Sequence, residues 1–166
     1  MAETTTTPTA AEACAGPDVQ AFRTFMSAHA LLVGAIESAF AAAELPPLVW
    51  HNVLTLLAEA PEGRMRPHEL ADALVLSRSG LSRVLDRMEA EEVLGRERCS
   101  GDRRGTYAVI SDTGRDLLAR MNPVYRNTVE LHFFPHLGGD AESMRVALER
   151  VADSAREACP VDPGAA

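Results

Sequence analysis

The apolar residues of this 166-residue chain recur at intervals of three and four almost throughout, and one stretch, residues 93–110, breaks that period. Such spacing is typical of amphipathic helices. Within the exception, residues 93–99 and 106–110 have the pattern of two short strands around a polar segment bracketed by Gly101 and Gly105, which predicts a β-hairpin. Aromatic residues make up only 5% of the chain, which disfavours a sheet-rich domain. We therefore expect a mainly α protein with one small hairpin.

Capping and breaking residues predict where the helices begin and end. Asp18 is expected to cap a first helix of about 25 residues. Ser77 is a good N-cap for a later helix that runs to about Glu92. Pro46-Pro47 precede a second helix that ends near 60–63, and a short helix follows over 67–74. Ser111 or Asp112 begins a long helix in which Pro123 and Pro135 predict kinks or breaks. Gly138-Gly139 form a turn before the last helix.

The chain divides into five parts by composition and pattern. Residues 1–17 are small, Thr-rich and Pro-containing and are expected to be a disordered tail. The other parts are a first helical region over 18–45, a region of short helices and the hairpin over 46–111, a second helical region over 112–158 and a tail over 159–166.

Several classes of protein are disfavoured. No stretch is expected to approach the roughly 20 apolar residues that span a bilayer, and residues 1–17 lack the pattern of a secretory signal, so a cytoplasmic protein without membrane contact is expected. Cys14, Cys99 and Cys159 are widely spaced and odd in number, which disfavours disulfides and a zinc ribbon. No phosphate-binding loop, nucleophile–base pattern or metal-ligand cluster is found, so we expect neither an enzyme nor a cofactor.

Charge is distributed unevenly along the chain. The net charge is −8, and every basic residue is arginine. Residues 64–104 hold nine arginines and eight acids and so carry +1, which leaves −9 for the rest. A protein that binds a polyanion through one arginine-bearing face of an otherwise acidic body would have this distribution.

The arginines coincide with a pattern suited to duplex DNA. A short helix, a brief connector and a second helix form a helix-turn-helix, whose second helix fits the major groove. At about 100° per residue, one side of that helix is polar. We expect it to bind DNA through Ser77, Arg78, Ser79, Ser82, Arg83 and Arg87, with phosphate contacts from Arg66 and His68. In the hairpin, Arg103 and Arg104 suit the minor groove, and Asp102 and Asp86 would orient arginine side chains.

These residues resemble the winged helix-turn-helix of the MarR family, the multiple-antibiotic-resistance-type regulators of bacteria and archaea. The resemblance rests on Glu69-Leu70-Ala71, on the run from Leu76 to Arg83 with Asp86-Arg87-Met88-Glu89, and on a wing signature matched at Asp102, Arg104, Ile110, Ser111 and Gly114. The resemblance implies that 46–111 is a winged helix-turn-helix DNA-binding lobe, that 18–45 is an N-terminal dimerisation helix and that 112–158 are C-terminal dimerisation helices. It thus implies a homodimer that binds a pseudo-palindromic operator on double-stranded DNA, with half-sites roughly 34 Å apart. It also implies a repressor that a small, often phenolic effector releases.

Three residues are candidates for the effector site. His29, Trp50 and His51 lie on the helices where the family binds its ligands and would suit an aromatic acid, although each of them also fits a packed core or interface residue. His132 and His136 are four residues apart, as in some zinc sites, but Pro135 disturbs that geometry. The alternatives left open are a metal- or oxidant-sensing member of the family, and a protein-binding dimer without DNA function.

Overall fold

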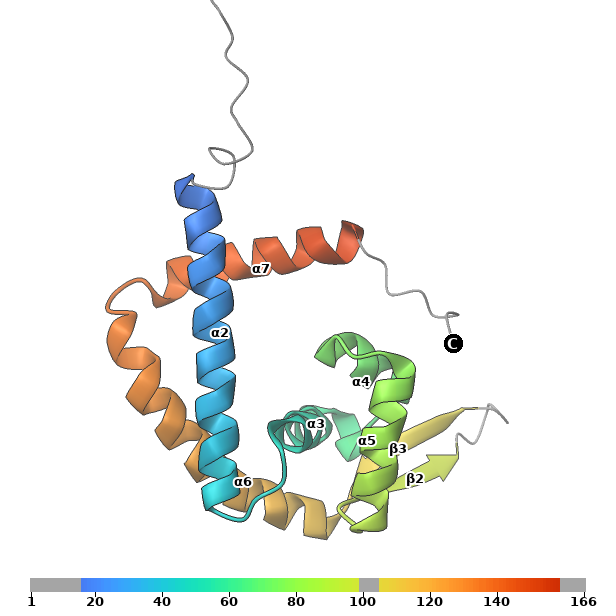
Figure 1. Cartoon of the computed structure of the whole chain (residues 1–166). Helices are drawn as coiled ribbons and strands as arrows, with labels where there is room; N and C mark the ends of the chain where they lie inside the picture. Colours follow the sequence, from blue (N-terminus) through green and yellow to red (C-terminus); the bar gives the residue numbers. More distant parts are fainter. Residues whose placement is uncertain (1–15, 99–104, 159–166) are drawn as a thin grey trace, which may run out of the picture.

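The structure, a computed structural model, describes residues 16–98 and 105–158 of the chain. It is mainly helical, as expected, with one small sheet beside a helix-turn-helix (Figure 1). The elements in chain order are α2 (Pro17–Ala42), α3 (Leu48–Glu59), η1 (Pro61–Gly63), β1 (Arg64–Met65), α4 (Pro67–Leu74), α5 (Arg78–Ala90), β2 (Leu94–Arg98), β3 (Thr106–Ile110), α6 (Asp112–His132), η2 (Phe134–His136) and α7 (Ala141–Ala158).

The expected hairpin is part of a three-stranded antiparallel sheet of order β1-β3-β2. β2 and β3 pair from Leu94 opposite Ile110 to Arg98 opposite Thr106. The strand β1, which pairs Arg64 with Val109, was not expected from the sequence. Two residues are too few to show an alternating pattern of apolar and polar side chains. They form a strand only because their backbone pairs with β3, which lies far away in the sequence.

The core of the lobe lies where α3, α4, α5 and the sheet meet. Leu54 and Leu57 of α3 are fully buried, as are Leu70 of α4 and Met88 of α5. α6 closes this core from below in Figure 1 and contributes Met121, which is also fully buried. The apolar stripe of α5 therefore faces inward and fixes which side of the helix is left for solvent.

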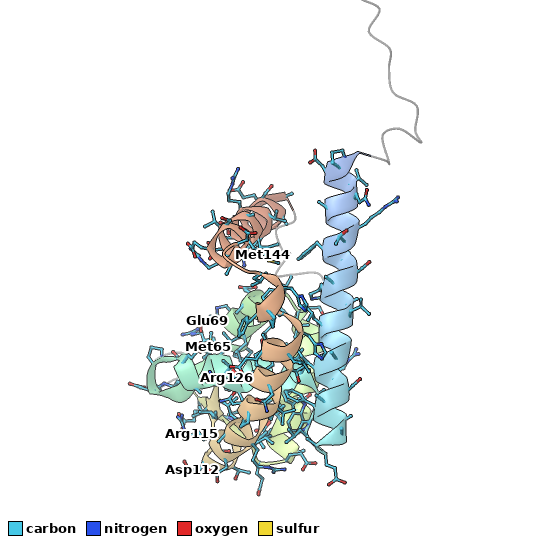
Figure 2. The ribbon with its side chains drawn as sticks, turned by 90° about the vertical axis from the view of Figure 1, so that its left-hand side faces the viewer. Met65, Glu69, Asp112, Arg115, Arg126 and Met144 are labelled. Atoms are coloured by element: carbon cyan, nitrogen blue, oxygen red, sulfur yellow. The ribbon has the colours of Figure 1, made fainter. Side chains whose placement is uncertain are left out.

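α2 packs against α6 and α3 through its C-terminal half. Ile36 and Phe40 are buried, and Glu37 accepts a hydrogen bond at 3.0 Å from the backbone N–H of Leu48, the first residue of α3. The N-terminal half of α2 is exposed and stands clear of the lobe in both views (Figures 1 and 2). By length and composition alone, α2 is apolar enough to cross a membrane, which corrects the expectation that no stretch approaches this.

Two other boundaries differ from expectation. α2 begins at Pro17 with Gly16 as its N-cap, not Asp18, because a proline fits the first turn, where the N–H groups lack helical partners. The predicted tail over 1–17 thus ends before Pro17, and its residues 1–15 lie outside the described range, as do 159–166. α6 runs as one helix through Pro123 and curves in Figure 1, and it ends at His132, just before Pro135 in η2.

Candidate nucleic-acid interface

α5 presents the polar face that the sequence predicts. The Ser77 hydroxyl caps the helix by accepting from the N–H of Gly80 at 3.1 Å. Leu81, Val84, Leu85 and Met88 are buried, so the opposite side is turned to solvent. The exposed residues on that side include Arg78, Ser79, Ser82, Arg83, Asp86, Arg87 and Glu89. The helix therefore combines an apolar anchor with a surface rich in hydrogen-bond donors.

α4 begins beside the same surface. Pro67 occupies its first turn, and the Glu69 carboxylate accepts from the backbone N–H of Arg66 at 2.8 Å. This contact fixes the chain at the point where the Arg66 side chain leaves it. The Arg66 guanidinium lies 5.5 Å from the centre of the Tyr107 ring on β3, within the range of a cation–π interaction.

A hollow of about 410 Å³ separates α5 from the sheet. Its polar lining comes from α4, α5, β2 and β3, and it contains several of the predicted DNA-binding residues. The lining residues are Arg66, Pro67, His68, Arg78, Leu81, Ser82, Leu85, Arg96, Gly105 and Thr106. The fold thus brings Arg66, His68, Arg78 and Ser82 together, although 16 residues separate Arg66 from Ser82 in the sequence.

Arg96 was not predicted from the sequence, and it joins the wing to α5. From β2 its guanidinium pairs with Asp86 and, at 3.2 Å, with Glu89, both on α5. Asp86 was expected to orient the wing, and this ion pair is the contact through which it would do so. The sequence did contain a sign of this contact: Asp86 and Glu89 are three residues apart on a helix and so share a face, and Arg96 follows on the next strand.

Arg64 is engaged elsewhere. Its guanidinium pairs with Glu62 and, at 3.6 Å, with Glu97, and it lies 5.0 Å from the centre of the Tyr107 ring. Its charge is therefore balanced by acids. The wing-tip residues Asp102, Arg103 and Arg104 lie outside the described residues.

The three residues proposed for the effector are not brought together. Trp50 and His51 are buried on α3, where the His51 ring stacks on Tyr125 at 4.4 Å and its Nε2 donates to Oδ1 of Asn122 at 3.0 Å. His29 is exposed on α2, and its ring lies 6.4 Å from that of Phe25. A hollow of about 400 Å³ between α2 and α6 is lined by none of the three, but by Leu32, Ile36, Tyr125, Thr128, Val129, Phe133 and Phe134.

Comparison with known proteins identifies the family. The MarR family model matches residues 44–105, which span the helix-turn-helix and most of the wing. The structure of AbsC, a MarR family transcriptional regulator from Streptomyces coelicolor, is 30% identical and has a TM-score of 0.78 over 92% of this chain and 99% of AbsC. The chain belongs to the MarR family of transcriptional regulators.

Two further solved structures are informative. Sco3205, a MarR family regulator from Streptomyces coelicolor solved in complex with DNA, is 28% identical with a TM-score of 0.78, over 97% of this chain and 96% of Sco3205. BpsR from Bordetella bronchiseptica is 19% identical with a TM-score of 0.63, over 81% of this chain and 97% of BpsR, and so shares the fold. Among curated proteins, none matches the chain.

The remaining histidines and the cysteines of this MarR family member concern the alternative hypotheses of metal sensing and oxidant sensing. His132 and His136 line a second hollow of about 470 Å³ with Ala28, Leu31 and other apolar residues of α2. Across residues 16–98 and 105–158, no group of three or more potential metal ligands is found. Cys14, Cys99 and Cys159 lie outside the described residues.

Proposed function

We propose that this protein is a dimeric, sequence-specific DNA-binding transcriptional repressor that inserts α5 into the major groove. The observation that carries the proposal is the exposed donor face of α5 beside an arginine-lined hollow at the sheet. The major groove admits one helix, and arginine is the most common reader of guanine there. The related Sco3205 was solved in complex with DNA, which supports this use of the lobe.

Each residue has an expected role in that complex. Arg78, Ser79, Ser82, Arg83 and Arg87 would contact bases and nearby phosphates, and the Ser77 N-cap would lie at the groove edge. Arg66 and His68 would bind phosphates, because they border the hollow beside α5. Arg103 and Arg104 would enter the minor groove, with Asp102 and Asp86 orienting arginines. The net charge of −8 would not prevent binding, because residues 64–104 carry nine arginines against eight acids, and the excess negative charge lies in the rest of the chain.

The dimer would form through the helices outside the lobe. Phe22, Met26 and Leu31 of α2 are exposed, as are Leu131 of α6 and Val151 of α7. Apolar side chains gathered on three helices are typical of an interface that a second copy covers. A two-fold dimer would place two copies of α5 on half-sites roughly 34 Å apart, which corresponds to a pseudo-palindromic operator.

A small molecule would modulate DNA binding from the hollow between α2 and α6. Its lining is mostly apolar, with the hydroxyls of Tyr125 and Thr128 as polar groups, which suits an aromatic ligand. DNA binding by BpsR, which has this fold, is regulated by 6-hydroxynicotinic acid. The protein would act in the cytoplasm, without catalysis and without a cofactor.

The test begins with duplexes selected by the wild-type protein from a random pool, followed by titration of the best duplex in a fluorescence anisotropy assay. Arg83→Ala should weaken binding by about tenfold or more and relax the preference at one base position. Arg120→Ala, which removes an exposed arginine of α6 outside the lobe, serves as the matched control and should bind like wild type. Equal binding by all three proteins would contradict the proposal. In the same assay, 6-hydroxynicotinic acid or benzoate should release the DNA.

A further inference from the structure

Val75, in the turn of the helix-turn-helix, combines a left-handed backbone with an exposed apolar side chain. It follows α4, its φ is 53°, and 72% of it is exposed. In the part of the chain that the structure describes, every other large exposed apolar side chain lies outside the lobe, on α2, α6, η2 or α7: Phe22, Phe25, Met26, Leu31, Leu131, Phe134, Val146 and Val151. A dimer interface can account for those residues but not for Val75.

The left-handed backbone at Val75 follows from the turn itself. The N–H of Leu76 bonds to the carbonyl of Ala71 at 2.9 Å, and that of Val75 bonds to the carbonyl of Asp72 at 3.3 Å. This pattern ends a helix with one residue at positive φ, a position that glycine usually occupies. A β-branched residue is among the least suited to it. Valine is therefore not explained by the turn, nor by burial.

The position of Val75 suggests what its side chain meets. Val75 lies two residues before Ser77, the N-cap of α5, and the first residues of α5, Arg78 and Ser79, are exposed beside it. Val75 lies within four residues of Arg78 and Ser79, so a duplex bound by the first turn of α5 would lie near it. The apolar group that a duplex displays in its major groove is the C5-methyl of thymine.

We propose that Val75 is a specificity-determining residue that packs its methyl groups against a thymine C5-methyl at the edge of the half-site. The inference rests on the proposed function, because it requires α5 to lie in the major groove. It adds an apolar contact to a surface that otherwise reads DNA through arginine and serine. The operator should accordingly contain a preferred thymine that no charged side chain selects.

The experiment compares wild type with Val75→Gly on the duplex that wild type selects. Val75→Gly should raise the Kd by about tenfold, the effect of losing one well-packed aliphatic contact. It should leave the slope of affinity against salt unchanged, because no charge is removed. It should also melt at or above the wild-type temperature, because glycine relieves the left-handed turn. A loss of affinity together with retained stability separates the contact from a folding defect.

A series of duplexes, each with one thymine replaced by deoxyuridine, identifies the partner methyl. Wild type should lose affinity for one member of the series, and Val75→Gly should show no further loss on that same duplex. The inference is overturned if Val75→Gly binds like wild type, or if its weaker binding couples to no thymine. If wild type selects no duplex at all, the proposed function fails, and the inference fails with it.

Discussion

At the scale of single residues, Gly114 shows how closely α6 approaches the strand region. It lies in the first turn of α6, where its N–H donates to the capping hydroxyl of Ser111 at 3.0 Å. A Cβ built on Gly114 would lie 2.0 Å from the carbonyl oxygen of Val93 and 3.1 Å from Ile110. A backbone atom at that distance has no rotamer with which to move aside, so the helix or the strand region would have to shift.

We therefore expect Gly114→Ala to lower the free energy of unfolding by about 2 kcal/mol or more, measured by chemical denaturation. In a helix with free space at this position, the same change would raise the free energy of unfolding by about 1 kcal/mol. The sign of the change in stability therefore shows whether the backbone of Val93 is as close as the structure has it. Gly95→Ala on β2 is the matched control, because a Cβ there meets nothing within 4 Å. An unchanged or higher stability of Gly114→Ala would contradict the close approach.

His51 is a buried polar residue with a single hydrogen-bond partner among the described residues. It is buried between Phe40 and Tyr125, and Asn122 of α6 is the hydrogen-bond partner of its Nε2. Its Nδ1 has no partner among the described residues. Asn122→Ala would deprive the other ring nitrogen of its partner as well, at the junction of the lobe with α6.

We expect Asn122→Ala to lower the free energy of unfolding by about 1–2 kcal/mol. Asn127→Ala, an exposed asparagine of the same helix, should change it by less than about 0.5 kcal/mol. Denaturant titration of the two variants in parallel provides the comparison. Equal effects would mean that the His51–Asn122 bond contributes little to stability.

At the scale of elements, Arg96 links α5 to the wing. This arginine of β2 pairs with Asp86 and Glu89 of α5, all three partly exposed. Partly exposed pairs contribute little to stability, typically less than about 1 kcal/mol. Their effect is expected in orientation, because a wing held in place loses less freedom when DNA binds.

We expect Asp86→Asn to weaken DNA binding by about three- to tenfold while changing the melting temperature little. Simple electrostatics predicts the opposite sign, because removing a negative charge near a polyanion strengthens its binding. Anisotropy titration on the selected duplex therefore separates the two effects. Glu130→Gln, which breaks the exposed pair with Arg126 on α6, is the control and should bind like wild type. Tighter binding by Asp86→Asn would contradict the orienting role.

Local signals predicted most elements, and non-local contacts explain the failures. Ser77, Pro67 and Ser111 act within one helical turn of themselves, so the sequence alone indicates the helices that they begin. β1 was missed because its pairing partner lies more than 40 residues away. That His29, Trp50 and His51 share a ligand stays a prediction, because helical spacing alone does not say which neighbour each helix face meets.

At the scale of the whole molecule, the described chain leaves much apolar surface uncovered. The N-terminal half of α2 is exposed along its length. α7, which has no buried residue of its own, passes behind α2 in Figure 1 and stands apart from it in Figure 2. On α7, Arg145 binds Glu142 and Glu149, and its guanidinium holds the pKa of the Glu142 carboxyl below its usual value. The same helix leaves the apolar side chains of Val146 and Val151 exposed, as expected of a helix that a partner covers.

Phe22 tests this arrangement most directly. It is 61% exposed on α2 and far from the lobe core, so a charge there should leave each chain folded. If the apolar helices hold two copies together, a buried glutamate in that interface would separate them, because burying an unpaired charge is highly unfavourable. We expect Phe22→Glu to halve the molar mass in light scattering. We also expect an operator affinity at least about 100-fold lower, because two linked half-site contacts become one.

Gln20→Glu adds the same charge to an exposed position two residues away and should remain dimeric. The recognition surface lies on α5 and the wing, so Phe22→Glu alters none of the proposed DNA-contacting side chains. A single half-site should consequently bind both variants with similar affinity, while the full operator distinguishes them. If Phe22→Glu keeps the wild-type molar mass, the exposed face of α2 is not the interface. If it becomes monomeric but binds the full operator as tightly as wild type, each lobe reads the DNA alone.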